Sequence, residues 1–500
     1  MTLLNRIEAT GNRLPDPATL FVIGTGIVMF LSWLATSMDW KVYSELTGTL
    51  TAQNLLSSDG IWWLLSHMVE NFIKFPPLAI VLVGMLGIGL AEKSGFLPAL
   101  LRHSILLVPQ SLLTPATIFL GIMSSMALDA GYVVLPPIAA ALYIVAGRSP
   151  LAGIAAVFAG ISAGFSANLL ITALDPLLSG LTQTAAQILV PDYHVAVTAN
   201  WWFMLVSTVL LTLVGWAVTA WFVEPRLEPA QELITNDEPE KCVDSQLEYT
   251  SEKKGLIHAL VALSVALIIV GLLIIIPGAP LYGTGSHFSR WIEATIPLLF
   301  ILFFVPGIVF GLSTGIIKND KQVIQMLGDT ISRLAPYIVM AFFAAQFIEC
   351  FKYTGLGKML AITGGQWLIA MQFDASMLIT CFILMAMSAN LLIGSASAKY
   401  AFLAPVFVPM LMQIGFSPEL TQVAYRIGDS VTNVITPMNP YMIIILVELR
   451  RYRKNAGFGT LIALMLPYTV IFSLIWIVML LIWMSTGLPL GPGGDLFISL

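Results

Sequence analysis

The segment from residue 417 to residue 440 most constrains what this chain can fold into. It lies within an apolar stretch long enough to cross a bilayer, yet it carries Arg426, Asp429, amides, hydroxyls and prolines. An ionisable side chain at membrane depth is costly, and it usually faces a cavity where it has a function. The prolines and Gly428 break the helical ladder, and the freed backbone groups need partners that ions or substrate can supply. We therefore predict a broken transmembrane helix that forms part of a transport site.

The composition supports a membrane-embedded chain. Of the 500 residues, 58% are hydrophobic and only 10% are charged, and the mean hydropathy is +0.89. These values are typical of a polytopic helical membrane protein. No basic run indicates a nucleic-acid partner, and the three cysteines and five histidines are scattered without the spacing of a disulfide framework or metal centre. The first apolar run is too long for a signal-peptide core, so we expect it to be retained.

Hydropathy predicts an all-α architecture. A spanning helix needs roughly 20 apolar residues. Nine spans are expected, at residues 16–37, 77–92, 149–178, 199–223, 255–277, 291–313, 336–352, 418–447 and 460–486. Two further apolar stretches, 109–146 and 376–413, are interrupted midway and are expected to be re-entrant hairpins. Two amphipathic segments, 52–75 and 314–335, are expected to lie along the membrane interface.

An internal repeat organises these elements. Residues 130–169 align without gaps with residues 398–437, and ten of the 40 positions are identical, with matched proline, glycine and Ser-Pro positions. The predicted organisation is a first repeat at 1–223, a cytoplasmic linker at 224–254, an extra scaffold helix at 255–277 and a second repeat at 278–500. The extra helix inverts the second repeat.

The distribution of basic residues sets the orientation. With the N-terminus in the cytoplasm, 16 of the 23 Lys and Arg residues lie inside and five outside, which satisfies the positive-inside rule. Inverted repeats that each contain a broken helix and a hairpin are typical of secondary transporters.

Polar residues at the two breaks are candidates for binding a coupling ion or proton. Hydroxyl, amide and carbonyl oxygens suit a hard cation such as Na⁺. The candidates are Asp429, Asp175, Asn433, Thr432, Asn168, Ser124, Ser125 and Ser388. Any of the neutral ones could instead only bond neighbouring helices. Asp175 could be an exposed helix-end carboxylate or a proton carrier, and Asp129 at the first hairpin tip is a further acid.

Three residues near the second break could contact an anionic aromatic substrate. Arg426 lies three residues before Asp429, so the two could form an internal ion pair, or Arg426 could bind a substrate carboxylate bidentately. Lys399 could be a second anion contact, or it could reach the interface. Tyr400 could stack on an aromatic ring or simply pack.

Two motifs resemble the AbgT family of p-aminobenzoyl-glutamate transporters. They are GNRLPDP at residues 11–17 and YRIGDSVTNVITPMNPY at residues 425–441, and the resemblance extends over nearly the whole chain. It implies a dimer in the bacterial inner membrane with nine spans and two hairpins per subunit, in which a scaffold domain pairs the subunits. It also implies transport linked to Na⁺ or the proton gradient, and export of sulfonamide antimetabolites by some members.

The resemblance also assigns site positions. Asn390, Pro418, Arg426, Asp429 and Asp175 match family site positions. The oxygen ligands at the second break could also form a Na⁺ site at Asn390, Asp429 and Asn433. Tyr400 stands where the family often has tryptophan.

The resulting hypothesis is a cation-coupled secondary transporter of p-aminobenzoyl-glutamate or a related folate-type carboxylate. No cofactor is expected apart from Na⁺ or H⁺, and the partners are an anionic aromatic substrate, lipid and a second copy of the chain. One alternative is a proton-driven exporter of sulfonamides. Another is an intramembrane hydrolase using two of Asp129, Asp175 and Asp429, but no nucleophile–base pair or metal cluster occurs at a recognisable spacing.

Overall fold

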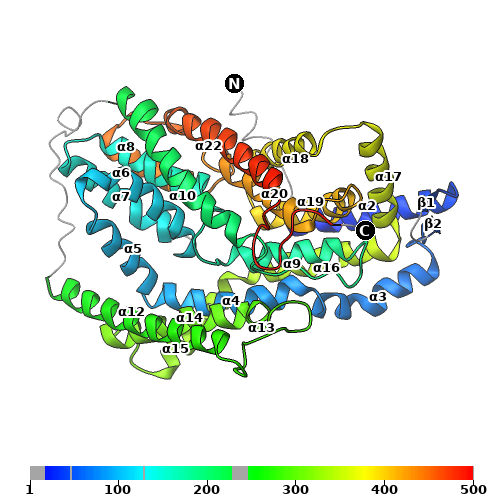
Figure 1. Ribbon diagram of the computed structural model, residues 1–500, viewed down its shortest axis with the longest axis horizontal. Helices are drawn as coiled ribbons and strands as arrows, with labels where there is room; N and C mark the ends of the chain where they lie inside the picture. The colour runs from blue at the N-terminus through cyan, green and yellow to red at the C-terminus, as the bar shows by residue number, and fades with distance from the viewer. Residues whose placement is uncertain (1–16, 45–47, 128–129, 228–245, 499–500) are drawn as a thin grey trace.

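The structure is a computed structural model that describes residues 17–44, 48–127, 130–227 and 246–498. Asp129, the motif residues 11–16 and most of the predicted linker lie outside the described residues. Within them the chain forms an elongated body of packed helices (Figure 1).

The first half contains the following helices: α2 (Pro17–Ser37), α3 (Ser58–Ile73), α4 (Pro76–Lys93), α5 (Phe96–Leu106), α6 (Leu113–Met123), α7 (Ala130–Val145), α8 (Pro150–Phe158), α9 (Leu174–Ala186) and α10 (Trp201–Val218). The second half contains α12 (Gln246–Ile275), α13 (Arg290–Glu293), α14 (Thr295–Thr314), α15 (Asp320–Arg333), α16 (Ala335–Tyr353), α17 (Leu356–Ala370), α18 (Ala375–Asn390), α19 (Ala396–Met412), α20 (Pro418–Val431), α21 (Met442–Tyr452) and α22 (Phe458–Thr486). Short 3₁₀ and π turns (η1–η5) join several of them.

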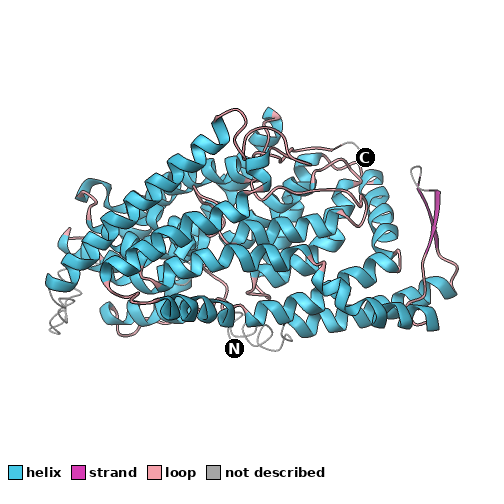
Figure 2. Ribbon diagram, turned by 90° about the horizontal axis from the view of Figure 1, so that it is seen from below, coloured by secondary structure: helices cyan, strands magenta, loops and turns pink. Residues whose placement is uncertain are grey.

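A small β-hairpin departs from the all-α expectation. Strands β1 (Lys41–Ser44) and β2 (Gly48–Thr51) pair antiparallel, with Lys41 opposite Thr51. Figure 2 shows the hairpin at one end of the body, and Val42 of β1 is buried against Met359 and Ile362 of α17. Each strand has only four residues, and an alternation of apolar and polar residues over so few positions is too weak a signal to predict a strand.

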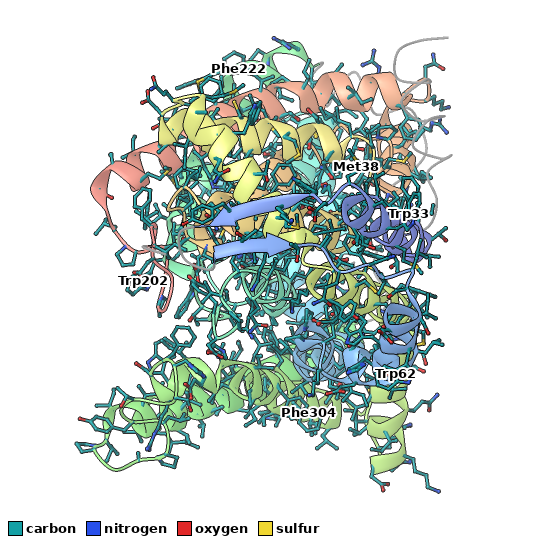
Figure 3. All side chains as sticks on the ribbon, turned by 90° about the vertical axis from the view of Figure 1, so that its right-hand side faces the viewer. Trp33, Met38, Trp62, Trp202, Phe222 and Phe304 are labelled. Atoms are coloured by element: carbon teal, nitrogen blue, oxygen red, sulfur yellow. The ribbon has the colours of Figure 1, made fainter. Side chains whose placement is uncertain are left out.

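Seven helices in the described part of the chain are long and apolar enough to cross a membrane, or eight if the bent pair α5 and α6 counts as one span. The chain is therefore a multi-pass membrane protein. The two other expected spans, 149–178 and 418–447, are each divided into shorter helices. Large apolar side chains such as Trp62, Trp202 and Phe222 point outward from the body (Figure 3), with 68%, 44% and 42% of their surface exposed. Such a surface suits contact with lipid rather than water.

Helices α12, α14 and α4 pack in succession and form a layer along one side of the molecule (Figure 1). Helices α13 and α15 lie in the same part of the molecule as this layer, and the two interrupted segments lie on the other side of α4 (Figure 1). The site therefore lies away from the outermost helix, α12, whose apolar surface is mostly exposed.

In both interrupted segments, the first helix ends further along the chain than the sequence indicated. Helix α8 continues through a π turn to Ala163 and resumes as α9 at Leu174, and α20 continues to Val431 before α21 begins at Met442. The prediction that Gly428 breaks the helix is wrong, because Gly428 is helical.

Gly428 instead allows a close contact between helices. A Cβ atom at this position would lie 2.6 Å from the Ile383 carbonyl oxygen of α18. Gly160, its partner in the sequence repeat, has the same role, since a Cβ there would lie 2.4 Å from the Ile118 carbonyl oxygen of α6. Glycine at each position lets the interrupted segment meet a neighbouring helix backbone to backbone.

Candidate functional site

Helix α20 carries most of the polar residues of the site, and every one of its residues is buried. Ser417 caps its N-terminus, where its hydroxyl accepts a hydrogen bond from the Leu420 amide at 2.9 Å. Pro418 occupies the first turn, where the missing N–H removes no helical hydrogen bond. Pro418, which the family motif assigns to the site, therefore starts the helix that positions Arg426 and Asp429.

Arg426 forms an ion pair with Asp175 from the other half of the chain. Its Nη2 atom lies 2.6 Å from Asp175 Oδ1, and only 2% of Arg426 and 8% of Asp175 are exposed. The carboxylate is fixed at the start of α9, where its Oδ2 atom accepts hydrogen bonds from the Thr172 amide at 2.6 Å and hydroxyl at 2.9 Å. Asp175 is thus not an exposed helix-end group, and the ion-pair partner of Arg426 is Asp175 rather than Asp429.

The rest of the Arg426 guanidinium is unused. Among the described residues, neither Nε nor Nη1 has a hydrogen-bond partner, although both atoms are buried. A buried donor without an acceptor costs free energy, so an arrangement that keeps two of them needs a reason. Nε and Nη1 lie on different edges of the guanidinium, so each could donate to a separate oxygen of a bound anion or water.

Lys399 forms the second buried ion pair. Its Nζ atom lies 2.6 Å from Asp429 Oδ1, and the two side chains are 0% and 2% exposed. Lys399 also donates a hydrogen bond to Asn390 Oδ1. The expectation that Lys399 reaches the interface is wrong, because it is buried at the centre of this cluster.

Asn390 links this ion pair to the second break. Its Nδ2 group lies 2.7 Å from the Asp429 carbonyl oxygen, 2.8 Å from Thr432 Oγ1 and 2.9 Å from Asn433 Oδ1. The structure therefore brings four predicted residues together near Lys399: Asn390 contacts Asp429, Thr432 and Asn433.

The candidates in the first half form a separate, smaller cluster. Asn168 Nδ2 donates to Ser125 Oγ at 2.5 Å and to the Ile122 carbonyl oxygen at 3.3 Å. Ser124 is buried, and its hydroxyl donates to the Gly121 carbonyl oxygen at 2.7 Å. Ser388 does not join either cluster, because it is exposed and bonds the Leu384 carbonyl oxygen of its own helix.

A cavity of about 340 Å³ reaches Thr172 at the start of α9, although neither Arg426 nor Asp175 lines it. Its lining includes Thr172, which binds Asp175, and the aromatic rings of Tyr132 and Tyr441. These two rings are stacked, with centroids 4.0 Å apart and planes 7° apart. The volume falls in the range of small-molecule pockets.

Tyr400 does not line this cavity. It is fully buried, its hydroxyl lies 2.6 Å from Thr182 Oγ1, and its ring lies 4.3 Å from the Tyr425 ring. Sequence reasoning missed Tyr132 and Tyr441 as site residues, although Tyr132 is the repeat partner of Tyr400 and Tyr441 ends the second motif. It also missed Glu419, a buried carboxyl that accepts a hydrogen bond from the Tyr193 hydroxyl at 3.0 Å.

Two buried ion pairs at interrupted helices in an apolar helical body are typical of a membrane transporter. The model of the AbgT putative transporter family matches residues 2–498, and the chain belongs to that family.

Relatives and solved structures agree with this assignment. The chain is 34% identical over 494 residues to the p-aminobenzoyl-glutamate transport protein of Escherichia coli K12, covering 97% of this chain and 95% of that protein. It resembles the crystal structure of the Alcanivorax borkumensis YdaH transporter at 41% identity and a TM-score of 0.89, covering 96% of this chain and 100% of that one. It also resembles Neisseria gonorrhoeae MtrF, described within a class of antimetabolite efflux pumps, at 40% identity and a TM-score of 0.89, covering 99% and 100%. The family and these relatives are transporters, so the hydrolase alternative is rejected.

Proposed function

We propose that this chain is a cation-coupled secondary transporter of p-aminobenzoyl-glutamate, or a related folate-type carboxylate, across the bacterial inner membrane. The observation that carries the proposal is the buried guanidinium of Arg426: among the described residues its Nε and Nη1 have no partners, and its ion-pair partner Asp175 is bound by Thr172, which lines an aromatic cavity. The name of the Escherichia coli relative supports the same substrate.

The chemistry of the substrate matches these groups. p-Aminobenzoyl-glutamate carries two carboxylates and one aromatic ring. A guanidinium binds a carboxylate through two parallel N–H donors, and each such pair on Arg426 includes Nη2, which keeps one hydrogen beside the one donated to Asp175. Tyr132 and Tyr441 offer the ring an aromatic surface in the same cavity. Lys399 is not part of this anion site in our proposal, because its ammonium is held by Asp429 and Asn390.

Binding of radiolabelled p-aminobenzoyl-glutamate to the purified chain in detergent tests this assignment. The Arg426→Lys variant keeps the charge but loses the two-donor geometry, and we expect its Kd to rise by about 10- to 100-fold, since hydrogen bonds to charged groups are worth about 1.5–3 kcal/mol. The matched control is Arg102→Lys, at a side chain that is 46% exposed and bound to Glu252. Equal affinity in wild type and Arg426→Lys contradicts the proposal.

A proton-driven exporter of sulfonamides is the second candidate, favoured by the likeness to MtrF. A sulfonamide has the aromatic ring but lacks the carboxylates. Its binding would therefore depend on Tyr132 and Tyr441 and be nearly insensitive to Arg426→Lys. Competition between sulfanilamide and p-aminobenzoyl-glutamate, measured in the wild type and in Arg426→Lys, separates the two candidate functions.

We also propose the finer architecture. The seven long helices and the two divided segments make up nine spans, and residues 109–146 and 376–413 form two re-entrant hairpins. The matched close contacts of Gly160 and Gly428 support an inverted repeat. The basic residues support a cytoplasmic N-terminus, and the family resemblance supports a homodimer. Labelling of single cysteines from each side of the membrane, and crosslinking in native membranes, test these points.

A further inference from the structure

The ammonium group of Lys399 lies among the oxygen ligands at which the sequence predicts a sodium site. Its Nζ atom is 2.6 Å from Asp429 Oδ1 and donates to Asn390 Oδ1, two of the oxygens assigned to that ion. The Lys399 side chain is 0% exposed, so no water replaces these contacts from outside. The Tyr425 ring lies 5.8 Å from the ammonium, and the Tyr425 hydroxyl donates to Asp429 Oδ1 at 3.2 Å.

The side chain of Asn390 turns its single oxygen toward Lys399 and its Nδ2 group toward the other oxygens of the cluster. Its Nδ2 group faces the Asp429 carbonyl oxygen at 2.7 Å, Thr432 Oγ1 at 2.8 Å and Asn433 Oδ1 at 2.9 Å. An amide has one oxygen, and here that oxygen accepts from Lys399. A Na⁺ ion placed among these groups would meet N–H donors on one side and an ammonium on the other. The residues present therefore do not fit Na⁺, because like charges repel strongly in a buried site.

The first half of the chain has no lysine at the equivalent position. Gly131 stands at the repeat position of Lys399, one residue after the aligned pair Ala130 and Ala398. The buried ammonium is therefore a feature of the second half and not of the repeat.

We infer that Lys399 is a built-in cation that replaces Na⁺ at the Asp429 site, so that this site does not couple transport to Na⁺. The inference refines the coupling ion of the proposed function and rests on it to that extent. Lys399 is accordingly a specificity-determining residue: with it, Asp429 is neutralised within the chain, and without it, Asp429 and Asn390 present two oxygens to an external cation.

Binding of ²²Na⁺ to the purified full chain in detergent tests the inference without using any substrate. We expect Asp429→Asn to leave the number of Na⁺ ions bound by the wild type unchanged. We expect Lys399→Ala to bind about one more Na⁺ per chain than the wild type, and the double variant Lys399→Ala/Asp429→Asn to lose that gain. Lys321→Ala, at an exposed lysine on α15, is the matched control and should bind as the wild type does.

Two results overturn the inference: a wild type that loses about one bound Na⁺ on Asp429→Asn, or a folded Lys399→Ala variant that gains none. Lys399→Gln, which is also neutral but fills more of the space, replaces Lys399→Ala if the latter does not elute as a monodisperse protein. p-Aminobenzoyl-glutamate binding measured on the same samples reports separately on the substrate. Failure of the substrate proposal is therefore distinguishable from failure of the Na⁺ inference.

Discussion

Replacing Asp175 by asparagine tests how strongly the buried pair with Arg426 joins the two halves of the site. Both oxygens of the carboxylate are used, one by Arg426 Nη2 at 2.6 Å and the other by the Thr172 amide at 2.6 Å and hydroxyl at 2.9 Å. Asparagine has one carbonyl oxygen, so its NH₂ group must face a donor on one of the two sides.

The structure allows the cost to be estimated. Arg426 is 2% exposed, and it would keep its charge with no counter-charge in place of Asp175. Removing one member of a buried ion pair costs about 3–5 kcal/mol. At about 1.4 kcal/mol per factor of ten, the ratio of folded to unfolded protein falls by roughly two to nearly four powers of ten.

Unfolding of the purified protein by SDS, followed by tryptophan fluorescence, measures this loss. The design is a double-mutant cycle with Asp175→Asn, Arg426→Met and the double variant. Each single variant leaves one buried charge unpaired, whereas the double variant leaves none. We therefore expect the double variant to be more stable than the sum of the single effects by about 1–3 kcal/mol. Effects that add to within about 0.5 kcal/mol would refute the reasoning.

Three further predictions use other parts of the structure. Gly428→Ala should lower the free energy of unfolding by about 1–3 kcal/mol because its Cβ would lie 2.6 Å from a carbonyl oxygen, whereas Gly271→Ala, with open space around it, should be near neutral; equal losses in the SDS assay would contradict this. Tyr441→Ala removes an aromatic surface of the cavity and should weaken p-aminobenzoyl-glutamate binding by about 2- to 13-fold, since a contact between the Tyr441 ring and the substrate ring is worth about 0.5–1.5 kcal/mol; unchanged affinity would show that the substrate does not contact Tyr441. Partial burial, and then the neighbouring His287, lower the pKa of His194 below its ordinary value of 6.5, so the folded state disfavours its proton and stability falls as the pH drops through and below that value. His194→Gln should flatten the dependence of Tm on pH between about pH 7 and 5, and a steeper dependence would show that the sign is wrong.

The sequence was most informative where the physical signal is local. Apolar length alone located the long helices, for example α10 within the expected span 199–223. It also indicated that the segment 417–440 is interrupted, although α20 continues past Gly428 to Val431. Gly428 was misread because glycine is compatible with two causes, a helix break or a close contact with another backbone, and only the position of α18 distinguishes them.

The pairing of charges lay beyond what local sequence shows. The spacing of Arg426 and Asp429 suggested a pair on one helix face, but each side chain finds its partner on another helix, Asp175 on α9 and Lys399 on α19. Helical spacing describes neighbours within one helix and contains no information on how helices from different halves are placed. The stack of Tyr132 on Tyr441 was missed for the same reason.

Uptake of radiolabelled p-aminobenzoyl-glutamate into proteoliposomes, with a pH gradient or a Na⁺ gradient imposed separately, tests the central claim most directly. The account predicts accumulation driven by a cation gradient in the wild type and its loss in Arg426→Lys at the same substrate concentration. Arg102→Lys should accumulate the substrate as the wild type does. No accumulation under either gradient, or undiminished accumulation in Arg426→Lys, would contradict the claim that this chain moves the substrate through Arg426.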